Sequence, residues 1–165
     1  MSLTYESHSP AETRRLGEQL ARLFQPGDVV LLQGDLGAGK TCLAQGIGRG
    51  LKVAEAVKSS SFVLVNYYNG RLKVYHADLF RLNDAGEVFD LALEENSEDG
   101  LLLVEWPDRA MQEMPPDHLL VRFSVTGDKT RRIELTARGR RYEQLLSELA
   151  NLPAARGLSR TAAWS

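Results

Sequence analysis

The chain has 165 residues with 43% hydrophobic and 25% charged side chains, a composition that is ordinary for one globular domain and excludes wholesale disorder. Its 20 Lys and Arg residues against 22 Asp and Glu residues leave a net charge of −2, which argues against a protein that coats nucleic acid by charge alone. Apolar runs of at most four residues exclude a membrane span. A lone cysteine, Cys42, excludes an internal disulfide framework. Together with an N-terminus that lacks a signal-peptide pattern, this favours a cytoplasmic protein.

The N-terminal third of the chain is predicted to hold two helices on either side of a buried strand. Ser9 and Glu12 form a capping-box pattern at the start of the first helix, which ends before a Pro-Gly pair. Residues 28–33 are β-branched and leucine-rich, which indicates a buried parallel strand. Residues 41–51 are predicted as a helix, and the glycines within it require either close packing or an early helix end.

Asn69 and Gly70 separate two strand-like runs, residues 62–68 and 71–78, and this dipeptide is a strong signal for a β-hairpin with a two-residue loop. Such a loop determines which residues of the two strands lie opposite each other. The predicted pairs are Tyr68 with Arg71, Val65 with Val74, Phe62 with Ala77, and Ser61 with Asp78. His76 also lies within the second run and is interpreted as a packed or hydrogen-bonded strand residue.

The second half of the chain is predicted to form a helix, a strand, a second hairpin, a final amphipathic helix and a disordered tail. In chain order these are residues 84–95 (capped by Asp84), 101–106, 119–126 with 131–138, 142–149, and 151–165. The mixture of βα units and hairpins predicts an α/β domain over residues 1–150 whose sheet is partly antiparallel.

Residues 34–41 read GDLGAGKT and match the pattern G-x-x-x-x-G-K-[ST] at every fixed position, between a predicted strand and a predicted helix. The glycines allow the backbone N–H groups to point at phosphate oxygens, and the following helix presents its N-terminus to the anion. Lys40 is expected to reach the β- and γ-phosphates, and Thr41 to ligate Mg²⁺. The expected fold is therefore a P-loop NTPase-like three-layer sandwich with a mixed central sheet. The predicted ATP-binding residues are Asp35, Leu36, Gly37, Ala38, Gly39, Lys40, Thr41 and Cys42.

Two acidic residues are candidates for binding the metal and orienting the attacking water. Glu105 follows four apolar residues at the end of a predicted strand, where a nucleotide hydrolase needs a carboxylate. Asp78 is predicted to lie opposite Ser61, and a hydroxyl beside a carboxylate can bind Mg²⁺ or sense a γ-phosphate, although a structural Ser–Asp hydrogen bond would use the same pair. Lys40, Asp78 and Glu105 are predicted to be catalytic, with both acids and Thr41 as metal ligands. Which acid orients the water stays open.

Four blocks of the sequence, taken together, resemble the TsaE family, small bacterial ATPases of tRNA threonylcarbamoyladenosine biosynthesis. The first block is common to many phosphate-loop proteins, whereas the combination in this order is specific to the family. The resemblance extends over about residues 9–108. The blocks are GDLGAGKT at 34–41, SSSFVLVN at 59–66, HADLFRL at 76–82 and VEWPDR at 104–109.

The resemblance implies a function and further site residues. Ser60 and Ser61 fall on a switch-like segment, where the family usually has Pro-Thr, and Trp106 beside Glu105 is predicted to report on the nucleotide or partner state. The family hydrolyses ATP slowly and acts with the proteins TsaB and TsaD in tRNA modification. ATP or ADP and Mg²⁺ are the implied cofactors, and tRNA would be contacted indirectly or weakly.

Two other functions stay open on the same phosphate loop: a small kinase, and a nucleotide-dependent binding module with negligible turnover. A GTPase is disfavoured because the chain has no [NT]-K-x-D signature. The charges are unevenly distributed, since residues 84–99 hold seven acids and no base, and residues 129–141 hold six bases and one acid. These two segments are candidate partner surfaces, with solvated faces as the alternative.

Overall fold

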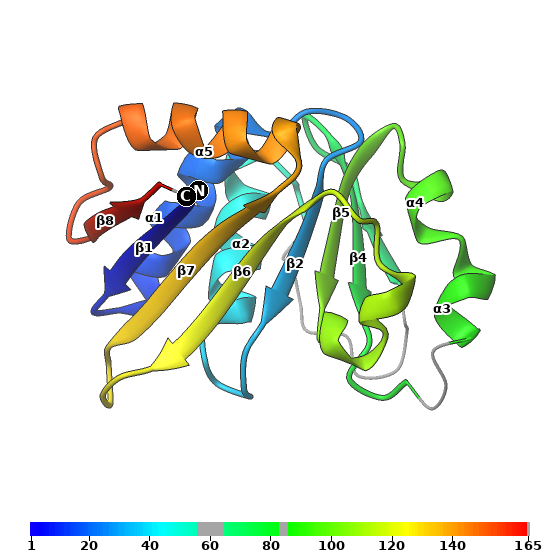
Figure 1. Ribbon diagram of the computed structural model, residues 1–165, viewed down its shortest axis with the longest axis horizontal. Coiled ribbons are helices and arrows are strands. Elements are labelled where there is room, and N and C mark those ends of the chain that lie inside the picture. The colour runs from blue at the N-terminus through cyan, green and yellow to red at the C-terminus, as the bar shows by residue number, and fades with distance from the viewer. Residues whose placement is uncertain (56–64, 83–85, 165) are drawn as a thin grey trace.

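The computed structural model describes residues 1–55, 65–82 and 86–164 (Figure 1). These residues form an eight-stranded sheet with the strand order β3-β4-β5-β2-β6-β7-β1-β8. The strands β4, β5, β2 and β6 are parallel neighbours, and β3, β7, β1 and β8 pair antiparallel, so the predicted mixed sheet is confirmed. The strands are β1 (Ser2–Ser7), β2 (Val29–Gln33), β3 (Val65–Tyr68), β4 (Lys73–Asp78), β5 (Gly100–Glu105), β6 (His118–Val125), β7 (Arg131–Arg138) and β8 (Ser159–Ala163).

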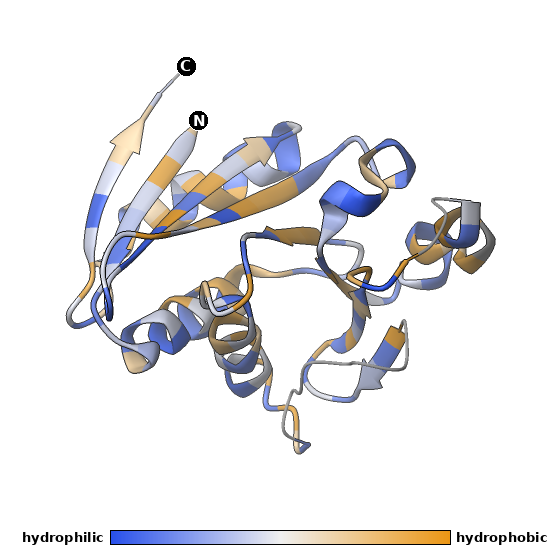
Figure 2. Ribbon diagram, turned by 90° about the horizontal axis from the view of Figure 1, so that it is seen from below, coloured by the Kyte–Doolittle hydropathy of each residue, from blue (hydrophilic) through white to orange (hydrophobic). Residues whose placement is uncertain are grey.

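Helices cover both faces of the sheet and complete the three predicted layers. One hydrophobic cluster joins the sheet to α1 (Pro10–Leu23), α2 (Lys40–Gly50) and α5 (Arg140–Asn151). A second cluster joins the other face to α3 (Gly86–Leu91), α4 (Leu93–Asn96) and the segment that holds η1 (Pro107–Arg109) and η2 (Met111–Glu113). Alternate residues of β5 belong to different clusters, as expected of a strand buried on both faces. Figure 2 shows the hydrophobic positions along these central strands.

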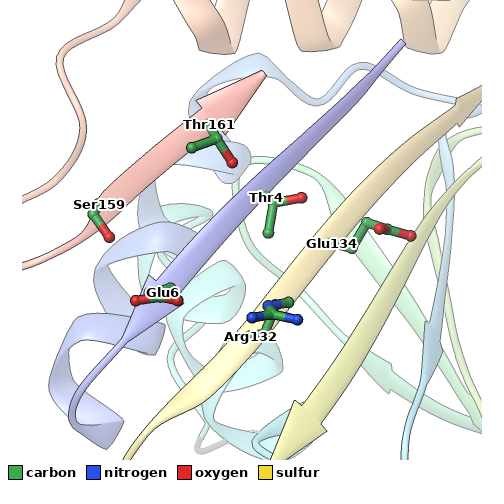
Figure 3. A pocket seen from close by; sticks show the side chains of 6 residues that line it. All are labelled: Thr4, Glu6, Arg132, Glu134, Ser159 and Thr161. Atoms are coloured by element: carbon green, nitrogen blue, oxygen red, sulfur yellow. The ribbon is translucent and has the colours of Figure 1, made fainter. Parts of the chain in front are cut away.

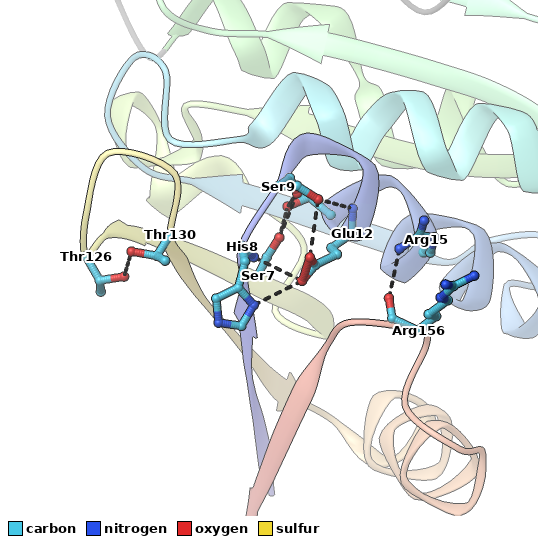
Figure 4. Close-up of polar contacts among 9 residues, drawn as sticks. Ser7, His8, Ser9, Glu12, Arg15, Thr126, Thr130 and Arg156 are labelled. Carbon is cyan, nitrogen blue, oxygen red and sulfur yellow. Dashed lines mark hydrogen bonds and ion pairs between the residues drawn. The ribbon is translucent and has the colours of Figure 1, made fainter.

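Local sequence signals account for the positions of α1 and α2. The Ser9 hydroxyl caps α1 by accepting a hydrogen bond of 3.1 Å from the Glu12 N–H, as the capping pattern predicts (Figure 4). The glycines of α2 reflect close packing and not an early helix end. A Cβ added at Gly46 would lie 2.0 Å from the Arg14 carbonyl oxygen, so only glycine allows α1 and α2 to approach this closely.

The register of the first hairpin differs from the prediction. Tyr68 lies opposite Val74 and not opposite Arg71, so the prediction of a two-residue loop at Asn69 and Gly70 is wrong. The Arg71 N–H instead donates to the Leu51 carbonyl oxygen at 2.6 Å, and the Arg71 guanidinium donates to the Ala21 carbonyl. These contacts hold the turn against the ends of α1 and α2 and away from the strand ladder. The predicted partner of Asp78, Ser61, lies outside the described residues.

The helix predicted over residues 84–95 is interrupted. It forms two short helices, α3 and α4, because Ala92 between them adopts a left-handed conformation with φ of 46°. The predicted cap, Asp84, lies outside the described residues. The predicted strand at 101–106, the second hairpin and the final helix are present as β5, β6 with β7, and α5. Thr126 and Thr130 close the hairpin turn with a hydroxyl–hydroxyl bond of 3.1 Å (Figure 4).

Part of the C-terminal segment is ordered into the sheet, so the disordered tail predicted at 151–165 is wrong for the described residues, which end at 164. Residues 159–163 form β8, which pairs antiparallel with β1, a strand that the sequence signals did not predict. Arg160 in β8 donates to the carbonyl oxygens of Leu149 and Ala150 at 3.0 and 2.9 Å. These bonds satisfy carbonyl groups at the end of α5, which have no partners within the helix. Order in this segment therefore comes from distant partners and not from its own apolar residues.

The outer face of the β7-β1-β8 half of the sheet is polar. Along β1 the buried residues Leu3 and Tyr5 alternate with Thr4 and Glu6, which point to the opposite face. This face has a hollow of about 550 Å³. It is lined by Thr4, Glu6, Arg132, Glu134, Ser159 and Thr161 (Figure 3). Within residues 1–55, 65–82 and 86–164, no helix is long and apolar enough to cross a membrane.

Candidate nucleotide site at the strand ends

The predicted phosphate loop connects the end of β2 to the start of α2. Gly37 and Gly39 have φ angles of 77° and 111°, in the left-handed region that glycine adopts without steric cost. The Ala38 N–H donates to the Asp35 carbonyl, and the Leu43 N–H to the Gly39 carbonyl, both at 3.1 Å. The loop therefore makes a tight turn directly into a helix N-terminus, the arrangement that binds phosphate.

The eight predicted ATP-binding residues differ in exposure along this loop. Asp35, Leu36 and Gly37 are exposed at its tip, whereas Ala38 and Lys40 are buried. Three further predicted residues, Gly39, Thr41 and Cys42, are half-buried around the first turn of α2.

An arginine that the sequence analysis did not select also contacts the loop. Arg131, the first residue of β7, donates from Nη2 to the Gly37 carbonyl at 3.3 Å and from Nη1 to the Thr130 carbonyl at 2.9 Å. The β6–β7 turn and the phosphate loop are thus tied together by one side chain.

Lys40 is the buried cation of the site. Its Nζ donates to the Gly34 carbonyl and lies 3.6 Å from the centroid of the Trp106 ring, over the ring face. Burial lowers the pKa of the Lys40 ammonium, and the negative charges of Glu105 and Asp78 oppose this shift. In this conformation the ammonium is held by a carbonyl dipole and an aromatic face, both of which attract a cation.

Asp78 and Glu105 are the last residues of the parallel strands β4 and β5, and they lie opposite each other in the register. Both are buried, with 9% and 3% of their surface exposed. The Asp78 carboxylate accepts a hydrogen bond of 3.0 Å from the Phe80 N–H. Burial raises the pKa of the Asp78 carboxyl, the Phe80 N–H lowers it, and the charge of Glu105 raises it further. The fold thus places two buried carboxylates at the ends of adjacent strands, where their charges act on the Lys40 ammonium.

Trp106 links this cluster to the far side of the sheet. Its backbone is left-handed, with φ of 59° and ψ of 48°, a conformation that costs a non-glycine residue roughly 1–2 kcal/mol. Its ring packs on Phe80 with a centroid distance of 4.8 Å, and the Arg109 guanidinium lies 5.8 Å from the Phe80 ring. An unfavourable backbone conformation that persists beside charged groups is typical of a functional site.

His76 is a neighbour of the site whose contact the sequence analysis missed. Its Nε2 lies 2.7 Å from Glu105 Oε2, and both side chains are almost completely buried. His76 and Asp78 alternate along β4 and so share a face, which the sequence shows. The adjacency of β4 and β5, which brings Glu105 to that face, cannot be predicted from the alternation alone.

The residues present suit a magnesium ion that is held partly by a nucleotide. Within the described residues, no three His, Cys, Asp or Glu side chains gather as a metal cage. Magnesium is commonly bound by one or two carboxylates together with substrate phosphates and water. The donor set of Thr41, Asp78 and Glu105 fits that chemistry. The switch-like residues Ser60 and Ser61 lie outside the described residues.

Comparison with known proteins assigns the chain to a family. Residues 7–133 match the family described as "Threonylcarbamoyl adenosine biosynthesis protein TsaE". The TsaE protein of Bacillus subtilis is 39% identical over 150 residues, which cover 90% of this chain and 94% of that protein. The TsaE protein of Treponema pallidum is 38% identical over 128 residues, covering 77% of this chain and 95% of that protein.

The fold is similar to that of a solved relative. The crystal structure of YdiB from Bacillus subtilis superposes with a TM-score of 0.75 and 34% sequence identity, covering 91% of this chain and 95% of that chain. Agreement over nearly the full length of both chains includes the sheet that carries the candidate site. From the family match, the relatives and this structural likeness, the chain belongs to the TsaE family.

Proposed function

We propose that this protein is a slow ATPase of the cytoplasm that acts with TsaB and TsaD in the threonylcarbamoyladenosine modification of tRNA. The observation that carries the proposal is the meeting of a phosphate loop with two buried carboxylates, Asp78 and Glu105, at the ends of adjacent strands. The names of the relatives, tRNA threonylcarbamoyladenosine biosynthesis proteins, support the pathway.

The geometry supports a division of roles among the side chains. The phosphates of ATP lie along residues 34–41, and Lys40 moves from the Trp106 ring to neutralise the γ-phosphate. The Thr41 hydroxyl and one acid would hold Mg²⁺, which would supply charge neutralisation at the transferring phosphate. The other acid accepts a hydrogen bond from water and orients it for attack. Either Asp78 or Glu105 can take this part, because the two buried acids lie opposite each other at adjacent strand ends.

Phosphate release from Mg-ATP by the purified protein tests the enzymatic part of the proposal. We expect slow release that needs no second substrate. Strict dependence on an added acceptor, with a phosphorylated product, would instead establish a kinase. Nucleotide binding without any turnover, alone or with partners, would establish a binding module.

A pull-down with the TsaB–TsaD complex tests the partner assignment. We expect binding that differs between ATP and ADP, because hydrolysis then has a consequence for the complex. Binding of free tRNA with comparable affinity in the absence of both proteins would contradict the indirect role of tRNA. Absence of binding to the complex with either nucleotide would contradict the pathway role.

A further inference from the structure

The inference concerns His76, and it rests on the proposed function of Glu105. His76 lies on β4, two residues before Asp78, on the face that packs towards α2. Glu105 lies opposite Asp78 on β5, so His76 reaches the Glu105 carboxylate diagonally across the two parallel strands. The two side chains are 1% and 4% exposed, and the distance between Nε2 and Oε2 is 2.7 Å.

The hydrogen-bonding roles follow from the chemistry of the two groups. An ionised carboxylate only accepts hydrogen bonds, so in this pair the His76 Nε2–H is the donor and the Glu105 Oε2 is the acceptor. A hydrogen bond to an ionised acceptor is shorter and stronger than a neutral one, in agreement with the observed distance. The other ring nitrogen, Nδ1, is buried and has no partner among the described residues. The contact with Glu105 is therefore the polar interaction that orients the ring.

The backbone hydrogen bonds of a strand do not fix its side-chain torsions, so the orientation of a carboxylate at a strand end depends on the groups that contact it. Asp78 is oriented by the Phe80 N–H. Glu105 has a longer side chain and depends on a contact from a neighbouring strand. Effective hydrolysis requires the carboxylate to be in place before the nucleotide arrives, because reorganising a charged group during the reaction raises the barrier.

We propose that His76 is the positioning residue of the site: its imidazole N–H holds the Glu105 carboxylate in one orientation beside Lys40. In this role His76 acts through Glu105, the side chain that its Nε2 contacts. Outer partners of this kind typically contribute 10–100-fold to activity or metal affinity.

Four variants separate positioning from simple support of the fold. His76→Leu removes the donor, and His76→Gln keeps an amide N–H at about the reach of Nε2. Glu105→Gln removes the charge of the acceptor. His118→Leu is the matched control, because His118 is also buried and also loses one bond, the 2.8 Å contact of its Nδ1 with the Pro115 carbonyl. His118 begins β6, at the opposite end of the parallel strands from the phosphate loop.

Steady-state measurements of ATP hydrolysis should distinguish these variants by their kcat and KM values. We expect His76→Leu to lower kcat by about 10–100-fold with KM within about twofold of wild type, and His76→Gln to recover most of the loss. His76→Leu should cause no further loss in a Glu105→Gln background, because the two residues act as one unit. His118→Leu should lower the melting temperature and leave kcat unchanged. If His76→Leu does not fold, His76→Asn, which is too short to reach Glu105, takes its place.

A histidine NMR spectrum of the nucleotide-free protein gives a readout that needs no turnover. We expect an exchange-protected imidazole N–H resonance that His76→Leu removes, His118→Leu retains and Glu105→Gln shifts. An unshifted resonance in Glu105→Gln, additive losses in the double variant, or an equal loss of kcat in His118→Leu would each overturn the positioning role. Wild-type protein that shows the resonance and no hydrolysis would instead overturn the proposed ATPase function.

Discussion

At the scale of single residues, the position of Lys40 determines what its removal should do. Lys40→Ala removes the cation that neutralises phosphate charge, so we expect ATP hydrolysis to fall by more than about 100-fold. The fold should survive, because the ammonium is buried at a cost that the variant avoids. Hydrolysis assays with a melting curve check this, and Lys52→Ala, at an exposed lysine just beyond α2, is the control. Retained turnover in Lys40→Ala would refute the site.

The Lys40–Trp106 contact predicts an optical signal. The ammonium lies 3.6 Å from the ring centroid, and bound phosphate should draw it away, which changes the surroundings of the indole. The chain has two tryptophans, so Trp164→Phe leaves Trp106 as the single emitter. We expect the fluorescence of this variant to change on addition of Mg-ATP. The same change in Trp106→Phe, which keeps only the exposed Trp164, would show that the signal arises elsewhere.

At the scale of elements, a hydrogen bond and an ion pair join the start of α5 to the start of β2. The Tyr142 hydroxyl accepts a hydrogen bond of 2.8 Å from the Val29 N–H, and Arg141 forms an ion pair with Asp28 at 2.8 Å. Tyr142→Phe leaves a buried N–H without a partner, which lowers the free energy of unfolding by about 1–3 kcal/mol. Each kcal/mol lowers the melting temperature by about 2–4 °C. Thermal denaturation measures this, and Tyr67→Phe, at an exposed tyrosine, should change little. Equal melting temperatures for wild type and Tyr142→Phe would contradict it.

The same tyrosine makes the free energy of unfolding depend on pH. Burial raises the pKa of Tyr142 from 10.0 to about 12, so the unfolded chain releases this proton more readily than the folded one. Its contribution to stability is complete below pH 10 and is lost as the pH rises towards about 12. The stability difference between wild type and Tyr142→Phe should therefore narrow over that range. Denaturant titrations at several pH values check it, and a constant difference would contradict the assignment.

Elements whose signals are local could be predicted from the sequence. The cap at Ser9 and the turn at residues 34–41 depend on neighbours within a few positions. The β3–β4 register could not be predicted, because the Arg71 backbone bonds to Leu51, which lies far away in sequence. Strand β8 has few apolar residues and owes its order to β1 and α5. In the site, the phosphate loop is a local motif, whereas the His76–Glu105 contact depends on which strands are neighbours.

At the scale of the whole molecule, the two charged segments lie on opposite halves of the sheet. The acidic segment includes α4, beside β4 and β5, and the basic segment includes the outer face of β7 (Figure 1). Such a separation of charge steers the approach of partners and orients them. Arg131 is a poor probe of the basic surface, because its side chain also holds the phosphate loop. Arg132, in the polar hollow of Figure 3, is a cleaner one.

Charge reversal tests whether these ends bind the TsaB–TsaD complex. We expect Arg132→Glu, or the pair Glu94→Lys and Glu95→Lys, to weaken binding by about tenfold at low salt and less at high salt. Arg22→Glu, at an exposed residue of α1 outside both segments, is the control. Unchanged affinity in both reversals would leave the two segments as ordinary solvated faces.

The pairing of β1 with β8 also has a practical consequence for handling the molecule. Ser2 lies opposite Ala163, so the two ends of the chain lie side by side at the edge of the sheet, several strands away from Lys40 (Figure 1). A short flexible linker could join them, which makes circular permutation feasible. A fluorophore or surface anchor attached beyond the exposed strand β8 would stay clear of the nucleotide site and would leave the buried Met1 in place.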